Sequence, residues 1–359
     1  MVYYIRFLKP PKLDTKTGNV RALITITTDL GDDFYPGNLT LHAMIITDYW
    51  EEPMTEWHTV LWKKGMRTAW IEVGKLPSRG TKFMRLLVST QCTEVADTVL
   101  LNDLPEILSA RSDTFGWDDP QAGNKIERRY KTAQGEGRSI YEQTGESIAR
   151  HIWDAGIALA AFLSDIVLHP QPTSHLAMTL TRTTPHGPKI LELGSGCGIV
   201  GLEIAHLCPI SDVLLTDLPE AMAIMDYNVS KARKSSGTGK ITTATLDWDD
   251  ALPEFIRQGQ CDLVMVSDCT YNCDSIPALV KTLAAVIERS PPALVVVAMK
   301  VRHDSEAVFF DLMAKAGLIK AENYAILLPD QQRADTEQAL EAVDVYVFRK
   351  EKDERADRS

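Results

Sequence analysis

The chain lacks the features that mark membrane, secreted and nucleic-acid-binding proteins. Its 359 residues carry a net charge of −11, whereas general binding to a phosphate backbone requires a basic surface. The longest apolar runs, DLVMVSD and ALVVVAMK, are far shorter than the ~20 residues that span a bilayer. The first residues, MVYYIRFLKPPKLD, have no charged-then-apolar signal layout. We therefore expect a globular protein whose acidity suits a cationic partner, with no membrane or nucleic acid as partner.

Paired cysteines are also missing. The six cysteines form no CxxC pair and no set with histidines at metal-ligand spacing. This spacing predicts neither a disulfide framework nor a zinc site. We expect reduced thiols in a protein of the cytosol or the nucleus, with no bound metal.

Residues 1–110 are rich in short β-type segments. Stretches such as RALITITTDL, WHTVLWKK and RTAWIEVGKL are β-branched, aromatic and partly alternating, with Gly, Pro and Asp between them. The pattern predicts an N-terminal β-rich domain, a small sandwich or barrel. We find no catalytic constellation in its sequence.

Residues 111–139 are polar, glycine-containing and aperiodic, which predicts a linker. This segment carries a basic cluster of Lys125, Arg128, Arg129 and Lys131. The cluster is either part of a solvated loop or a contact for a substrate or partner. The last residues, 351–359, are dominated by charge and predict a disordered tail.

Strands and helices alternate over residues 140–350. The strand patterns KILELG, DVLLTDL, DLVMVSD and ALVVVAMK are separated by segments with helical periodicity. This order predicts an α/β fold, an open and mostly parallel sheet with helices on both faces. The last two strands, 323–328 and 344–349, have no helix between them and should form an antiparallel hairpin at one edge.

The segment KILELGSGCGIVGLEIA, residues 189–205, joins a strand to a helix through glycines. Glycines let the backbone turn sharply and let a ligand approach, and ligands in such sheets bind beyond the carboxyl ends of the strands. Gly196, Gly198 and Gly201 match the GxGxxG of dinucleotide sites. Asp217, at the end of the next strand, could bind the ribose of NAD or of S-adenosylmethionine. These residues alone leave both cofactors open.

Three features favour S-adenosylmethionine. Glu192 precedes the first glycine, where it would repel a pyrophosphate but attract a cationic amino-acid end. Asp247 and Trp248 follow the third strand, where they could meet the amino group and the ring of an adenine. We also expect no second half of a dehydrogenase after the terminal hairpin.

Several sequence blocks resemble the seven-β-strand S-adenosylmethionine-dependent methyltransferases. The blocks are ILELGSGCGIVGLEIA, LLTDLPEAM, TLDW and SDCTYNCDSIPALVKTL. The sequence is similar in particular to the protein-lysine methyltransferase branch, which acts on translation factors and chaperones. A (D/E)xxY motif and a WDA segment mark that branch, and they match Asp268–Tyr271 and residues 153–155. The resemblance covers residues 140–350 and implies a Rossmann-like seven-stranded sheet with S-adenosyl-L-methionine as cofactor.

The resemblance also implies roles for individual residues. Asp268 would orient the incoming amine or relay its proton, and Tyr271 would line the acceptor pocket. Trp153 would lie under the methionine end of the cofactor. Lys300, after the fifth strand, either faces a substrate or lies in a solvated loop. The complete set implied to bind the cofactor is Trp153, Glu192, Gly194, Ser195, Gly196, Gly198, Asp217, Leu218, Asp247, Trp248 and Asp268.

The leading interpretation is a monomeric enzyme that methylates a lysine of another protein, such as a translation factor or a chaperone. One alternative keeps the cofactor but takes a small amine as acceptor, because acceptor specificity depends on loops. Another is a catalytically idle methyltransferase fold used for binding or assembly. The intact glycine loop with Asp217, Asp268 and Tyr271 argues against the idle fold, and a dehydrogenase is the least favoured reading.

Overall fold

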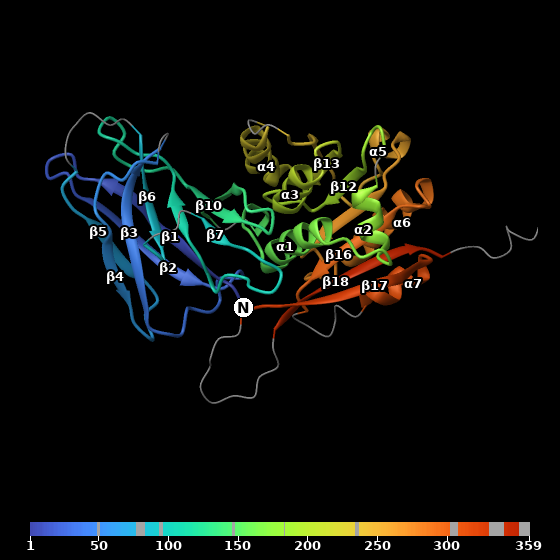
Figure 1. Cartoon of the computed structure of the whole chain (residues 1–359), viewed down its shortest axis with the longest axis horizontal. Coiled ribbons are helices and arrows are strands. Elements are labelled where there is room, and N and C mark those ends of the chain that lie inside the picture. The colour runs from blue at the N-terminus through green and yellow to red at the C-terminus, as the bar shows by residue number, and fades with distance from the viewer. Residues whose placement is uncertain are drawn as a thin grey trace, which may run out of the picture. The chain divides into compact units, whose positions relative to one another are not determined.

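The computed structural model describes residues 1–48, 51–76, 83–92, 96–145, 148–182, 184–233, 237–301, 308–329 and 341–351. They divide into two compact units (Figure 1). The β unit comprises Met1–Val99, Asp103–His151 and Pro329–Gln338. The α/β unit comprises Leu100–Asn102, Ile152–Leu328 and Ala339–Ser359. The predicted tail from residue 352 onward lies outside the described residues.

The β unit consists of two sheets. One has four strands in the order β5-β2-β1-β8, and the other has seven, in the order β11-β10-β9-β6-β3-β4 with β7 paired to β10. The strands are β1 (Tyr3–Leu13), β2 (Val20–Thr27), β3 (Leu39–Thr47), β4 (His58–Trp62), β5 (Ala69–Val73), β6 (Met84–Ser89), β7 (Asp97–Thr98), β8 (Ile107–Leu108), β9 (Ala110–Ser112), β10 (Lys125–Lys131) and β11 (Gly137–Gln143). The predicted β-rich domain is confirmed.

Alternation of side chains explains how these strands form a core. Ile5 and Phe7 of β1 pair with Ile26 and Ile24 of β2, so all four side chains lie on one face of the sheet. They belong to one apolar cluster that also contains Trp62 of the other sheet. The opposite face of the β1–β2 pair carries polar residues, among them Arg6 and Thr27.

The prediction of a linker at residues 111–139 was wrong. β10 and β11 pair antiparallel over their whole length, from Lys125↔Gln143 to Lys131↔Gly137. Arg128 is buried and donates from Nε to Glu142 Oε1 at 2.8 Å. Paired charges fill inward positions of β10 that apolar residues would normally occupy. The sequence of β10 therefore resembles that of a polar loop. Arg128 of the basic cluster lies neither in a solvated loop nor on a surface that is free to contact a partner.

The α/β unit contains one seven-stranded sheet in the order β14-β13-β12-β15-β16-β18-β17. Its strands are β12 (Lys189–Leu193), β13 (Asp212–Asp217), β14 (Lys240–Thr245), β15 (Leu263–Ser267), β16 (Leu294–Met299), β17 (Leu318–Leu327) and β18 (Ala342–Lys350). The helices are α1 (Asp154–Leu168), α2 (His175–Thr181), α3 (Ile199–Leu207), α4 (Pro219–Ala232), α5 (Glu254–Gln258), α6 (Ile276–Arg289) and α7 (Val308–Lys315), with a short 3-10 helix, η1 (Ile148–Arg150), in the β unit. The expected Rossmann-like fold is confirmed, whereas α2 and α5 were not predicted.

The order of the strands places a ligand site. β14, β13, β12, β15 and β16 run parallel, and β18 runs antiparallel to both β16 and β17, as expected for the terminal hairpin. The chain moves outward from β12 to β14 and then returns to β15 on the other side of β12. This reversal is the topological switch point at which such sheets bind ligands.

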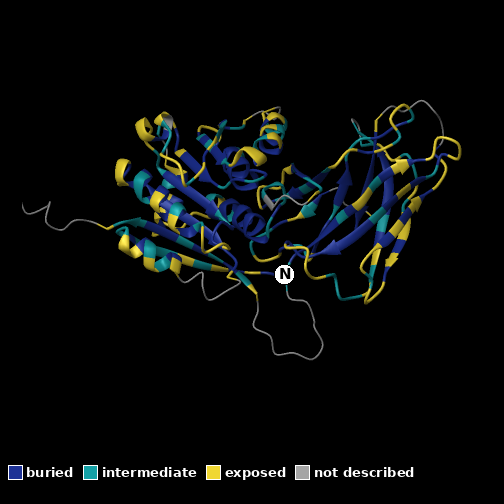
Figure 2. Ribbon diagram, turned by 180° about the vertical axis from the view of Figure 1, so that it is seen from behind, coloured by how far each residue is buried: buried dark blue, intermediate teal, exposed yellow. Residues whose placement is uncertain are grey.

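The central strands of this sheet are buried from both sides (Figure 2). α6 and α7 share an apolar cluster with β15 and β16, while α1 packs against α3. Continuous apolar strands such as LVVVAM in β16 are typical of such doubly covered sheets. Among the described residues, no helix is long and apolar enough to cross a membrane.

Candidate active site

The loop from Gly194 to Gly198 leaves β12 at the switch point and enters α3. Gly194 has φ +66°, in the left-handed region that side chains disfavour. A Cβ added to it would lie 2.4 Å from Cys269 Sγ and 3.2 Å from Cζ2 of Trp248. Backbone conformation and space thus both require glycine here. The same contacts place Trp248 against the loop, as the adenine prediction needs.

Glu192 caps the helix that follows the loop. The N-cap of α3 is Gly198, which has no side chain to offer, so the first helical N–H groups need another acceptor. Glu192 Oε2 accepts from the backbone N–H of Gly201 at 2.9 Å. A Cβ on Gly201 would lie 2.5 Å from that oxygen. Gly201, the third glycine of the motif, therefore leaves room for the Glu192 carboxyl of the preceding strand to cap the helix.

Burial dominates the electrostatics of Glu192. Loss of solvent raises the pKa of its carboxyl from an ordinary 4.5 to about 8, against the opposing hydrogen bond from Gly201 and with a further contribution from Asp217. The group is thus mainly protonated at neutral pH. A nearby cation would favour its ionised form.

Asp217 ties the end of β13 to the same loop. Its Oδ2 accepts from the N–H of Gly196 at 2.6 Å, and its Oδ1 accepts from the N–H of Leu218 at 2.7 Å. Burial raises the pKa of Asp217, and these two hydrogen bonds counteract part of that rise. Ser195 is held beside it, because the Ser195 N–H donates to the carbonyl of Thr216 at 3.0 Å.

The DxxY segment begins where β15 ends. Asp268 is 6% exposed, adopts φ +55°, and donates its N–H to the carbonyl of Ala298 at 2.9 Å. A non-glycine residue in this conformation is uncommon and is often found at functional sites. The next residue, Cys269, is buried with its Sγ 3.7 Å from the Gly194 carbonyl oxygen. The segment therefore packs directly on the glycine loop.

The structure brings four of the predicted site residues together around Cys269. Burial and the charges of Asp217, Asp268 and Glu192 raise the pKa of its thiol well above the ordinary value. Burial, Cys269, Asp217 and Asp268 likewise raise the pKa of Tyr271, whose side chain is half exposed. Carboxyl groups from β12, β13 and β15 therefore converge with the tyrosine at one edge of the sheet. Neither Glu192 nor Asp217 forms an ion pair with a described residue.

Three other predicted residues are placed less centrally. Asp247 is exposed and its Oδ1 accepts from the Asp249 N–H at 3.0 Å, so it organises its own turn. Leu218 is 39% exposed beside Asp217. Trp153 is partly buried and precedes α1, and the position of its indole relative to the loop stays a prediction.

Sequence reasoning missed a buried ion pair behind the site. Lys300 Nζ lies 3.1 Å from Asp154 Oδ2 and 3.4 Å from Glu341 Oε2. Asp154 is fully buried and Lys300 is 7% exposed, so Lys300 is not in a solvated loop. The pair joins the first turn of α1 to the end of β16. The aspartate of the WDA segment was the available signal, but 146 residues separate it from its partner.

Another missed residue supports the glycine loop from α4. The amide Nδ2 of buried Asn228 donates to the carbonyl of Cys197 at 2.9 Å. Among the residues that the structure describes, no group of three or more His, Cys, Asp or Glu side chains could hold a metal ion.

Comparison with known proteins identifies relatives of both units. A family model described as lysine methyltransferase matches residues 133–316, just over half of the chain. The UPF0665 family protein C23C4.06c of Schizosaccharomyces pombe is 28% identical over 320 residues, covering 86% of this chain and 91% of that protein. Coverage of this extent includes much of the β unit. The Protein N-lysine methyltransferase METTL21A of Danio rerio is 24% identical and covers 56% of this chain and 77% of its own. The EEF1A lysine methyltransferase 3 of Mus musculus is 26% identical and covers 60% and 78%.

Proposed function

Because the chain belongs to the lysine methyltransferase family, we propose that its active site is the edge of the sheet where Glu192, Asp217 and Asp268 converge. The chain is an S-adenosylmethionine-dependent protein-lysine methyltransferase, and its cofactor is S-adenosyl-L-methionine rather than a dinucleotide. The roles of individual residues and the identity of the protein substrate form the proposal. The observation that carries it is the cluster of carboxyl groups around Cys269.

The residues at this edge fit a cationic methyl donor. S-adenosylmethionine supplies the methyl group from a sulfonium. Burial raises the pKa of both Glu192 and Asp217, so a bound cation would stabilise their charged forms. We assign Asp217 to the ribose hydroxyls, Trp248 to the adenine ring and Trp153 to the methionine end. Leu218, Asp247 and the glycine loop would complete the binding site.

Asp268 and Tyr271 are assigned to the acceptor. A lysine amine with a pKa near 10.4 must lose its proton before it can attack, which costs roughly 4–5 kcal/mol at pH 7. Asp268 would accept a hydrogen bond from the amine, fix its direction and help to relay the proton. The Tyr271 ring would form a wall that favours a lysine stem and excludes water.

Apolar side chains at the same edge suit a protein acceptor. Leu218, Tyr271 and Val301 follow β13, β15 and β16 and are 39%, 48% and 53% exposed. Exposed apolar groups beside a catalytic site are typical of a surface that docks a protein. A free small amine would make little use of them.

We assign the substrate to the translation machinery. One relative is named as a methyltransferase of EEF1A, and the acidic site together with a net charge of −11 favours a basic surface around the target lysine.

We further propose that the enzyme acts as a monomer in the cytosol or nucleus. A larger mass in light scattering, or a tagged protein confined to the secretory pathway, would contradict that part.

The proposal is tested by transfer of a labelled methyl group. Purified elongation factor 1A and, separately, a cell lysate depleted of the endogenous enzyme are incubated with the enzyme and labelled S-adenosylmethionine. Modified lysines are then located by mass spectrometry. Asp268→Asn should abolish transfer but retain cofactor binding. Asp274→Asn, an exposed position on the same loop, should leave transfer unchanged. Full activity of Asp268→Asn would refute the role assigned to Asp268. Label that appears only in proteins other than elongation factor 1A would refute the proposed substrate.

A further inference from the structure

The β unit contains a cavity that the methyltransferase chemistry does not use. It measures about 470 Å³ and lies beside the polar face of the β1–β2 pair. Arg6 of β1 and Thr27 of β2 line it, together with Arg67 and Phe34. Glu142 at the end of β11, Thr144, Gly145 and His151 also line it. This volume lies in the range of about 300–1,000 Å³ found for small-molecule sites.

Two polar groups in this cavity have no partner among the described residues. Thr27 is 4% exposed, and its hydroxyl Oγ1 is buried without a hydrogen bond. Arg6 donates from Nη2 to the Asp29 carbonyl at 2.9 Å, but its buried Nε makes no hydrogen bond. Buried polar groups are normally paired. A hydroxyl and a guanidinium N–H left unpaired in one cavity indicate an acceptor that a ligand would supply.

The charge balance of the cavity favours an anion. Among the described residues, neither Arg6 nor Arg67 forms an ion pair, and the Arg67 guanidinium lies 5.5 Å from the centre of the Phe34 ring. The carboxylate that lines the cavity, Glu142, forms an ion pair with Arg128, and the charge of Arg6 contributes to lowering its pKa. His151 Nδ1 lies 3.8 Å from Glu142 Oε2. The Nε–H of Arg6 and the exposed guanidinium of Arg67 thus remain as donors for a ligand.

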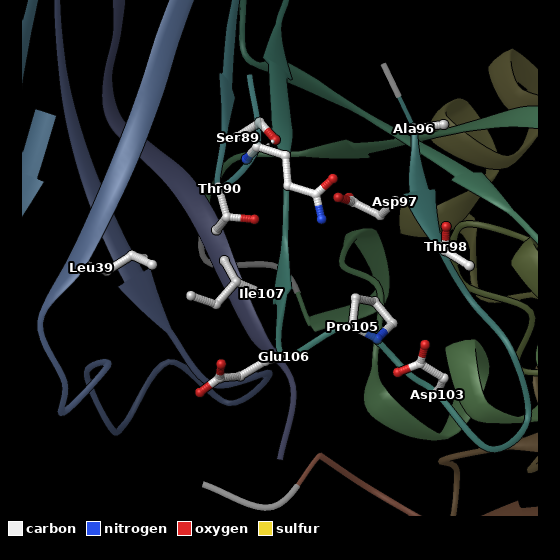
Figure 3. Close-up of a pocket in the computed structure, with 11 residues that line it drawn as sticks. Leu39, Ser89, Thr90, Ala96, Asp97, Thr98, Asp103, Pro105, Glu106 and Ile107 are labelled. Atoms are coloured by element: carbon white, nitrogen blue, oxygen red, sulfur yellow. Dashed lines mark hydrogen bonds between the residues drawn. The ribbon is translucent and has the colours of Figure 1, made fainter. Parts of the chain in front are cut away.

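A second cavity of the β unit provides a contrast (Figure 3). It measures about 300 Å³ and its charged lining residues are Asp97, Asp103 and Glu106. Asp97 accepts from the Ser109 N–H at 2.8 Å and from the Ser109 hydroxyl at 2.7 Å. Its partly buried carboxyl is therefore satisfied within the protein, unlike the hydroxyl of Thr27.

We propose that the cavity at Arg6, Thr27 and Arg67 binds a small organic anion, with a phosphate or carboxylate group carried on an apolar body. The two arginines would contact the oxyanion, as guanidinium groups commonly do. The Thr27 hydroxyl would donate a hydrogen bond to the oxyanion, and the side chains of Phe34 and Leu8 would contact the apolar body. This site is distinct in residues and in unit from the methyl-transfer site.

The test is calorimetric titration of the full-length protein with phenyl phosphate and, separately, with benzoate. We expect saturable binding of at least one of them with a Kd of about 1 mM or tighter. Arg6→Gln and Arg67→Gln should each weaken it at least about tenfold. Thr27→Val should weaken it about threefold without lowering the melting temperature, because the hydroxyl has no partner to lose. Preference for phenyl phosphate or for benzoate would identify the head group.

Matched controls make the result decisive. Arg21→Gln removes the same charge from an exposed position on β2 and should leave binding unchanged. Equal weakening in this variant would show a general charge effect and overturn the proposal. Identical binding in all variants, or no saturable binding below about 10 mM, would also overturn it. Because Arg67 is exposed, its variant tests the site even if Arg6→Gln does not fold. Binding of S-adenosylhomocysteine should be unaffected throughout, which separates this proposal from the methyltransferase assignment.

Discussion

In the β unit, buried arginines are matched with buried glutamates, as in the pairs Arg85–Glu127 and Arg128–Glu142. In the α/β unit, Glu192 is equally buried and Asp217 is partly buried, but neither has an arginine partner among the described residues, and their charges raise the pKa of the Cys269 thiol. Burial works to raise the pKa of Glu127, yet Arg85 and the Ser139 hydroxyl outweigh it and the pKa is lowered. For Glu192 burial prevails and the pKa rises to about 8. Matched charges complete a core, whereas unmatched ones indicate a ligand that carries the missing charge.

The α/β unit also contains a matched pair, which shows that position decides the role. Asp154 and Lys300 are buried and lie 3.1 Å apart. They join a helix to a strand end and resemble the pairs of the β unit. Among the described residues, the carboxyl groups that gather beside the glycine loop are those of Glu192, Asp217 and Asp268, near the ends of β12, β13 and β15.

The largest effect is expected from breaking a matched pair. Arg128→Met leaves the carboxylate of Glu142 buried without its partner, which should lower the free energy of unfolding by about 3–5 kcal/mol. Urea denaturation measures this change. The double variant with Glu142→Leu should recover most of the loss, and failure to recover would mean that packing rather than charge explains the effect.

A smaller but site-specific loss is expected at the third glycine of the loop. The added methyl of Gly201→Ala would lie 2.2 Å from Leu215 Cδ2 and 2.5 Å from Glu192 Oε2. We expect destabilisation of about 1–3 kcal/mol and loss of cofactor binding, measured by thermal melting and calorimetry. Gly137→Ala, where a Cβ meets nothing within 4 Å, is the control and should change neither.

Glu192→Gln should alter the dependence of stability on pH. The folded protein holds a proton on Glu192 up to about pH 8, whereas the unfolded chain releases it near pH 4.5. The unfolded state therefore binds fewer protons in this window, and stability falls as pH rises through it. The glutamine keeps an acceptor for Gly201 but cannot ionise. Relative to wild type it should gain at least about 1 kcal/mol between pH 5 and pH 8, and parallel pH profiles from denaturation would contradict the raised pKa.

The smallest effect is expected at the exposed end of the basic cluster. Lys125 lies 3.1 Å from Asp113 with 30% of its side chain exposed. Lys125→Ala should change the free energy of unfolding by less than about 0.5 kcal/mol, in contrast to Arg128→Met. A large loss would show that the whole cluster, rather than its buried member, supports the β unit.

The sequence predicted the α/β sheet well because its buried strands are continuous apolar runs. KILEL, LVMVS and LVVVAM all form strands as expected. β10 was missed because its sequence, KIERRYK, buries charges whose main partners, Arg85 and Glu142, lie on β6 and β11. Hydrophobic patterns cannot reveal such a strand, because the partner Glu142 lies on β11.

The candidate site shows the same limit. The glycine loop, Asp217 and the DxxY segment are local signals, so the sequence located them. The capping of α3 by Glu192 depends on close approach of Gly201, and the Lys300–Asp154 pair depends on the arrangement of α1 and β16. Contacts of this kind follow from tertiary structure, and no short motif encodes them.

We propose that Glu192 and Asp217, which form no ion pair with a described residue, belong to a site for a methyl donor. Calorimetric titration with S-adenosylhomocysteine, with NADH as the comparison, tests it most directly. We expect micromolar binding of S-adenosylhomocysteine, loss of that binding in Asp217→Ala, and no binding of NADH. Binding of NADH, or binding of S-adenosylhomocysteine that survives Asp217→Ala, would contradict it.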